Sequence, residues 1–186
     1  MNIQSIADRV KGILLEPREE WEKIKMEHIS NKDLIISYVL PFTAVAALIS
    51  VIVIWFSTYL GFGIAMRFAT YQLVLPVISV IVAAVVINEL AETFDSAKDL
   101  NNAFKLVAYA YTPALLVSII TSISWALSFL GLLGLYGIYL LWIGLPVMMK
   151  TPEDKRLVYI IAAVVVILLV NVTISAIFGI DRLGYY

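Results

Sequence analysis

The chain has 186 residues, of which 62% are hydrophobic and 15% are charged, and its formal net charge is −1. Its mean hydropathy is +0.95. A soluble chain of this length could not bury so many apolar residues in a single core. The near-neutral charge argues against a nucleic-acid partner and against strong attraction to anionic lipid. Because the chain has no cysteine, disulfides and thiolate sites are excluded.

Residues 1–33 are predicted to form a cytoplasmic amphipathic helical region. Pro17 suits the first turn of a second short helix, in which Trp21 and Ile24 form an apolar edge. Three positions remain open for the first helix: packed on the protein itself, in the lipid interface, or docked on a partner. Its apolar residues recur at helical spacing, opposite Asp8, Arg9 and Lys11, and are Ile3, Ile6, Val10, Ile13 and Leu14.

Five apolar stretches each approach the roughly 20 residues that a helix needs to cross a bilayer, and together they predict a transmembrane domain over residues 34–178. Backbone amides in hydrocarbon must be paired internally, and barrel-type alternation is absent, so we expect helices. The predicted fold class is all-α, a polytopic membrane bundle, with residues 179–186 as a short external tail. The spans are Leu34–Phe56, Tyr71–Leu90, Phe104–Trp125, Leu130–Met149 and Leu157–Phe178.

Lysine and arginine are distributed unevenly around these spans. If the N-terminus is cytoplasmic, eleven of the 13 basic residues face inward and only Arg67 and Arg182 face outward. The positive-inside rule therefore predicts an N-in, C-out topology. The inward residues are Arg9, Lys11, Arg18, Lys23, Lys25, Lys32, Lys98, Lys105, Lys150, Lys155 and Arg156.

Three segments resemble the Yip (Ypt-interacting protein) family, in the same order. Val10-Lys-Gly-Ile-Leu-Leu-Glu-Pro17, followed by Trp21-Glu-Lys-Ile24, is similar to the family's N-terminal signature. Leu100-Asn-Asn-Ala-Phe-Lys-Leu-Val-Ala-Tyr-Ala-Tyr-Thr-Pro113 resembles its entry to the third span, and Gly144-Leu-Pro-Val-Met-Met-Lys-Thr-Pro-Glu-Asp-Lys155 resembles its connector between the fourth and fifth spans. The resemblance implies a prokaryotic multi-pass protein of the cytoplasmic membrane. Eukaryotic members associate with Rab-type GTPases, but the Asp-Leu-Tyr-Gly-Pro motif of many of them is absent here.

Polar residues near the inner ends of spans two and three are candidate contacts for a partner or ligand. Carboxylates at membrane depth are costly and usually face a bundle interior or water, and Lys105 could pair with Glu89 or Glu92. These three residues, with Tyr109 and Tyr111, would then line a cytoplasm-facing vestibule between the two spans. Alternatively, these are interfacial charges, with Lys105 snorkelling to the headgroups. The candidates are Asn88, Glu89, Glu92, Lys105, Tyr109, Tyr111 and Pro113.

A second set of residues is expected to serve helix packing. Small residues let helices approach closely in membranes, and the fourth span contains Gly131, Gly134, Gly137 and Gly144. Asn171 in the fifth span is expected to make an interhelical hydrogen bond. The gaps that these glycines leave on the helix surface favour packing within one chain. Packing between copies of the chain, in a homo-oligomer, is the alternative.

The sequence contains no Walker loop, dinucleotide fingerprint, zinc spacing or nucleophile elbow, so no enzyme, cofactor or metal is predicted. We interpret the protein as a non-enzymatic membrane scaffold or organiser that meets protein or lipid partners at its cytoplasmic face. The alternative is a small channel or transporter for an ion or small solute, with its vestibule between spans two and three. A transporter requires a continuous polar path, whereas polar residues here cluster at the inner end of span two and in span five.

Overall fold

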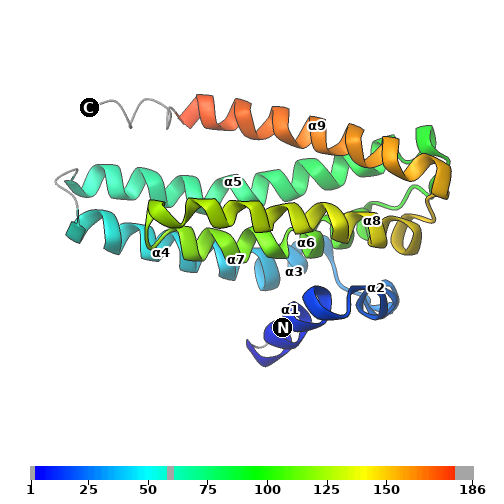
Figure 1. Ribbon diagram of the computed structural model, residues 1–186, viewed down its shortest axis with the longest axis horizontal. Helices are drawn as coiled ribbons and strands as arrows, with labels where there is room; N and C mark the ends of the chain where they lie inside the picture. Colours follow the sequence, from blue (N-terminus) through cyan, green and yellow to red (C-terminus); the bar gives the residue numbers. More distant parts are fainter. Residues whose placement is uncertain (1–2, 58–60, 179–186) are drawn as a thin grey trace.

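A computed structural model describes residues 3–57 and 61–178 of the chain, and the predicted external tail, 179–186, lies outside the described residues. The described part is helical and contains no strand. Its helices run side by side in an elongated bundle (Figure 1). The predicted all-α fold with five membrane-length helices is confirmed. These segments are Asn31–Phe56, Gly61–Leu90, Leu100–Thr121, Ala126–Met149 and Glu153–Thr173.

Several of the spans are composite. The first joins α3 (Asn31–Leu34), the π-helical η1 (Ile35–Val39) and α4 (Leu40–Ser57), and the second is the single helix α5 (Gly61–Leu90). The third consists of α6 (Leu100–Ala110) and α7 (Thr112–Thr121), and the short 3₁₀ turn η2 (Glu92–Phe94) precedes it. The fourth joins the 3₁₀ stretch η3 (Trp125–Leu135) to α8 (Tyr136–Met149), and the fifth is α9 (Glu153–Phe178). The helix of the second span therefore starts at Gly61, well before the predicted Tyr71.

Proline divides the third span near Pro113. Proline has no N–H and crowds the carbonyl four residues earlier, which here belongs to Tyr109. The Thr112 hydroxyl donates to that carbonyl at 2.6 Å, so the acceptor remains satisfied inside the bundle. The hydroxyl of Tyr38, from the first span, lies 2.6 Å from the same Thr112 oxygen. The break in the helix thus becomes a polar link between spans one and three.

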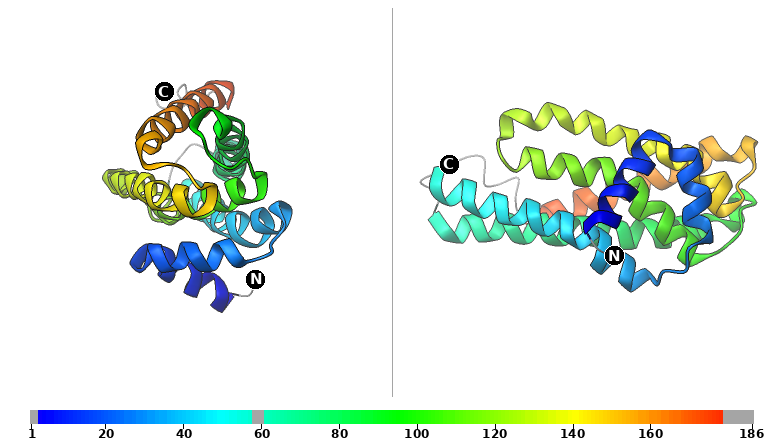
Figure 2. Two further views of the ribbon diagram at one scale, coloured as in Figure 1. Left: turned by 90° about the vertical axis from the view of Figure 1, so that its right-hand side faces the viewer. Right: turned by 90° about the horizontal axis from the view of Figure 1, so that it is seen from below.

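The first two helices, α1 (Ile3–Leu15) and α2 (Pro17–Met26), lie outside the bundle and cross it near one end (Figure 2). We call α1 and α2 the platform, and the end that they cover the platform end. Ile13, Trp21 and Ile24 have no exposed surface and belong to the bundle's core. The Tyr136 hydroxyl of α8 also donates to the Leu14 carbonyl at 3.0 Å. Of the three positions open for the amphipathic helix, the structure therefore shows packing on the protein itself.

Two of the four glycines of the fourth span mark close helix contacts. A Cβ placed on Gly137 would lie 2.7 Å from the backbone oxygen of Ala110, and one on Gly144 would lie 2.5 Å from Leu106. A Cβ on Gly134 would make an ordinary contact with Ala114 at 3.9 Å, and one on Gly131 would meet nothing within 4 Å. The tight approach is therefore confined to the half of this span nearer the platform end.

The substitution Gly137→Ala is expected to destabilise the bundle by about 1–3 kcal/mol, because α8 must move away from a backbone atom that cannot yield. Unfolding of the purified protein in mixed detergent micelles measures the loss. Gly131→Ala is the matched control on the same span, and it should leave the unfolding midpoint unchanged. Equal midpoints for the two variants would contradict a close contact at Gly137.

Candidate functional site

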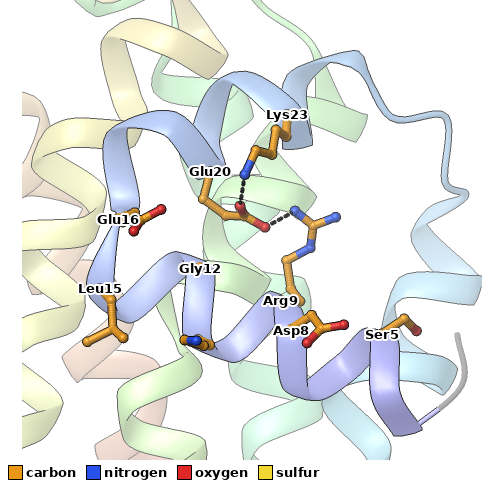
Figure 3. Close-up of a pocket in the computed structure, with 9 residues that line it drawn as sticks. Ser5, Asp8, Arg9, Gly12, Leu15, Glu16, Glu20 and Lys23 are labelled. Carbon is orange, nitrogen blue, oxygen red and sulfur yellow. Dashed lines mark hydrogen bonds and ion pairs between the residues drawn. The ribbon is translucent and has the colours of Figure 1, made fainter.

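An ionic cluster joins the two platform helices. Arg9 extends from α1 toward Glu20 of α2, and one of its guanidinium nitrogens binds a Glu20 carboxylate oxygen (Figure 3). The other terminal nitrogen donates to Glu27, just beyond the end of α2. Lys23 approaches the second Glu20 oxygen at 3.1 Å. A single arginine therefore connects α1 with both the middle and the end of α2.

The Arg9–Glu20 pair at the centre of the cluster is largely removed from solvent. The side chains of Arg9 and Glu20 are 11% and 8% exposed, so their attraction is screened less than that of a surface pair. Gly12 makes the space for this arrangement, because a Cβ there would lie 2.5 Å from the Glu20 carboxyl carbon. A glycine inside a helix costs about 1 kcal/mol relative to alanine. At this position the small residue allows α1 to approach a buried carboxylate.

Arg9 also connects the platform to the third span. Its guanidinium carbon lies 5.3 Å from the ring centroid of Tyr109, within the range of a cation–π interaction. The Tyr109 ring packs edge-on against Tyr38 at 4.7 Å. Burial alone would lower the pKa of Arg9, but the interactions with Tyr109 and with the two carboxylates outweigh this penalty, and its pKa is raised. Arg9 therefore remains a cation.

Lys105 of the third span holds the other end of α2. It is only 3% exposed, and its Nζ donates to the backbone oxygen of Glu27 at 2.7 Å. It also lies 3.5 Å from the Ile24 carbonyl. A cation at the C-terminus of a helix satisfies free carbonyls and opposes the negative end of the helix dipole. Lys105 is thus a buried cap for α2.

Trp21 fixes α2 against the fourth span. Its indole ring is fully buried, and a Cβ on Gly144 would lie 2.8 Å from it. The missing side chain at Gly144 therefore opens the slot that the indole fills. Tyr109 and Lys105 lie on the segment resembling the Yip family's third-span entry, whereas Trp21 and Gly144 lie on the other two such segments. All three segments meet at the platform end.

A polar pocket of about 500 Å³ opens beside the ionic cluster (Figure 3). Asp8 and Lys11 of α1, with Glu16 and Lys23 near the start and middle of α2, add exposed charges of both signs to its walls. Such a surface suits a charged, hydrated partner better than an apolar one. The pocket is lined by Ser5, Asp8, Arg9, Lys11, Gly12, Leu15, Glu16, Glu20 and Lys23.

The residues proposed for a vestibule lie in separate environments. Glu89 pairs with Lys98 at 2.8 Å and accepts from the Asn88 amide at 2.9 Å. Lys105 instead caps α2, so neither Glu89 nor Glu92 is its partner in the structure. Glu92 lies in the short turn η2.

The remaining candidates are also dispersed. Tyr109 lies beneath Arg9, and Pro113 begins α7. Tyr111 lines a separate cavity within the bundle, so the five residues expected to line a vestibule do not share one. Lys105 and Tyr109 alone among them belong to the site at the platform end.

Tyr111 lines a cavity of about 290 Å³ inside the membrane part of the bundle. Gly134, Gly137 and Asn171, three of the predicted packing residues, line the same cavity. The Ser79 hydroxyl lies 3.1 Å from the Asn171 amide oxygen, which is an interhelical hydrogen bond between spans two and five. Apart from these groups and Tyr111, the lining residues are apolar or glycine. No charged side chain is among those that line this cavity.

Sequence reasoning missed the ionic cluster, although two signals pointed to it. Glu20 shares a helical face with Ile24, four residues later, so an apolar edge that buries Ile24 also draws in the carboxylate. Gly12 interrupts a good helical pattern, and such a glycine usually has a packing reason. The role of Lys105 could not be read in this way, because its partner carbonyls lie far away in the sequence.

The substitution Arg9→Gln is expected to lower the free energy of opening the platform by about 3 kcal/mol, because the buried Glu20 would keep only the exposed Lys23 as a partner. Hydrogen exchange of residues 3–27, followed by mass spectrometry in detergent micelles, measures this opening. Lys11→Gln, an exposed position on the same helix, is the control and should keep full protection. Restored protection in an Arg9→Met/Glu20→Leu double variant would attribute the loss to the unpaired charge. Unchanged exchange in Arg9→Gln would contradict a holding role for the cluster.

Comparison with known proteins gives one match that spans this architecture. A family model described as the Yip1 domain matches residues 11–174, which include the end of α1, all of α2 and the five spans. No curated protein and no solved structure matches the chain. The match covers more than half of the chain and confirms the resemblance seen in its three segments. The protein belongs to the Yip1 domain family.

Proposed function

We propose that this Yip1 domain protein is a non-enzymatic membrane scaffold that holds a protein partner on its platform. The observation that carries the proposal is the way in which the platform is held. Arg9, Lys105 and Trp21 fix two short helices to the bundle through buried contacts. A rigid, charged surface attached to a membrane anchor can position a partner at little entropic cost. Lipid partners at the same face form part of this proposal.

The proposed location of the platform is the cytoplasmic side of the membrane. Eleven of the 13 basic residues support this assignment, because the positive-inside rule places them on one side of the five spans. The connectors that contain Lys98 and Lys150 lie at the platform end of the bundle (Figure 1). Partners would therefore be cytoplasmic proteins or the inner lipid leaflet.

The rival class, a channel or transporter, receives less support from the intramembrane cavity. Ions and small polar solutes need charged or polar groups along their path. The lining of this cavity is mostly apolar. The Ser79 hydroxyl donates to the Asn171 amide oxygen, and the Asn171 amide nitrogen donates to the Ile167 carbonyl. Such a cavity suits packing adjustments or an acyl chain better than a hydrated solute.

A photo-crosslinking amino acid at position Lys11, on the rim of the polar pocket, tests the scaffold proposal in intact cells. We expect a crosslinked protein adduct of defined mass, and we expect the Arg9→Gln substitution to abolish it by releasing the platform. The same crosslinker at Val172, which is 67% exposed on α9, is the control for random contacts in the membrane. Solute flux through proteoliposomes of the pure protein, with no adduct at Lys11, would instead support the transporter class.

A further inference from the structure

A groove separate from the polar pocket lies where α2, α8 and the first turn of α9 meet, and its volume is about 460 Å³. Successive helix residues are about 100° apart, so Arg18 and Glu22 occupy a different face of α2 from Glu20 of the polar pocket. The apolar wall of the groove is formed by α8. The residues that carry the argument are Arg18, Glu19, Glu22, Trp142, Pro146 and Arg156.

Arg156 is a largely buried cation whose one ion pair within the described residues is long and exposed. Its side chain is only 13% exposed, and the carboxylate of Glu153, 3.6 Å away, is itself 93% exposed. The guanidinium carbon lies 5.0 Å from the ring centroid of Trp142. Its Nε is enclosed and has no hydrogen-bond partner within the described residues. Arg156 also lies in the first turn of α9, where the helix dipole disfavours a cation and favours an anion.

The groove is electrically balanced as a whole. Arg18 and Arg156 contribute two guanidinium groups, while Glu19 and Glu22 contribute two carboxylates from α2. A simple anion would pair with the arginines but would be repelled by the carboxylates. A ligand that has an anionic group and a hydrogen-bonding cation a few atoms apart would match both pairs.

The groove opens at the boundary of the lipid-facing surface. Leu157, Val158 and Ile161 follow Arg156 on α9 and are 56%, 56% and 53% exposed. Trp142 is 39% exposed at the rim, and tryptophan is enriched at the level of lipid headgroups. An amphiphile bound here would have its polar part between α2 and α9 and its chains along α8.

We propose that this groove binds a phospholipid whose headgroup combines a phosphate with a primary ammonium, that is, a phosphatidylethanolamine. Arg156 and Arg18 bind the phosphate, and Glu19 and Glu22 accept hydrogen bonds from the ammonium. Quaternary ammonium headgroups lack N–H donors for these carboxylates, and glycerol headgroups lack the positive charge. The site deepens the lipid part of the proposed function, on which it rests, by naming the lipid class. It is separate from the protein-holding pocket, because it uses another face of α2 and no residue of the polar pocket.

Native mass spectrometry of the full chain in detergent micelles tests the site. The probes are dioleoyl phosphatidylethanolamine, phosphatidylglycerol and phosphatidylcholine, each added at the same concentration. We expect retention of phosphatidylethanolamine to exceed that of phosphatidylcholine by about tenfold, which corresponds to about 1.4 kcal/mol. Glu19→Gln/Glu22→Gln should remove this preference without weakening phosphatidylglycerol binding. Arg156→Gln should weaken retention of all three lipids.

Matched controls separate the lipid site from the rest of the molecule. Glu16→Gln, which lines the polar pocket, should leave lipid selectivity unchanged, and both glutamates of the groove are exposed, so their replacement should preserve the unfolding midpoint. Equal retention of phosphatidylethanolamine and phosphatidylcholine, stronger phosphatidylglycerol binding, or an Arg156→Gln variant with unchanged retention would overturn the proposal. Crosslinking from Lys11 would persist in each of these cases unless the scaffold proposal also fails.

Discussion

Two buried cations, Arg9 and Lys105, hold the platform on the bundle, and each satisfies groups that α2 could not satisfy alone. Lys105 caps the last carbonyls of α2, and Arg9 neutralises the carboxylate of Glu20. Short helices of this length are marginal in isolation, so their order depends on such tertiary contacts. Arg9 contacts Tyr109 of α6, and Lys105 itself belongs to α6. The position of the platform therefore depends on the third span.

The third span is itself positioned by its proline. Pro113 ends α6 near Tyr111, and Thr112 uses its hydroxyl both to satisfy the freed carbonyl and to meet Tyr38. Tyr38 in turn supports the Tyr109 ring beneath Arg9. A helix break inside the membrane is therefore coupled, through two aromatic rings, to the cation that holds α1. Polar groups at membrane depth are costly, and here the Tyr38 and Thr112 hydroxyls from two spans satisfy each other.

The spans were predictable because hydrocarbon imposes one strong constraint, about 20 apolar residues per crossing. The rule that membrane helices meet at small residues and through polar side chains predicted helix packing at Gly137 and Gly144 and a hydrogen bond at Asn171. The candidate site was harder, because its contacts depend on which helices become neighbours. Two alternatives were open for Lys105, pairing with Glu89 or Glu92 or snorkelling to the headgroups, but in the structure it binds carbonyls at the end of α2. Local spacing indicates that a charge is buried, and only the tertiary structure identifies its partner.

The short helix α2 links two surfaces of different chemistry. Glu20 and Lys23 face the polar pocket, whereas Arg18 and Glu22 face the groove beside Trp142. Trp21, between them in the sequence, is locked in its slot at Gly144, so α2 cannot rotate without exposing the indole. An occupant of the proposed lipid groove would therefore stabilise the same helix orientation that presents the polar pocket. If a bound lipid strengthens partner binding in the pocket by some factor, linkage requires that the bound partner strengthen lipid binding by that same factor.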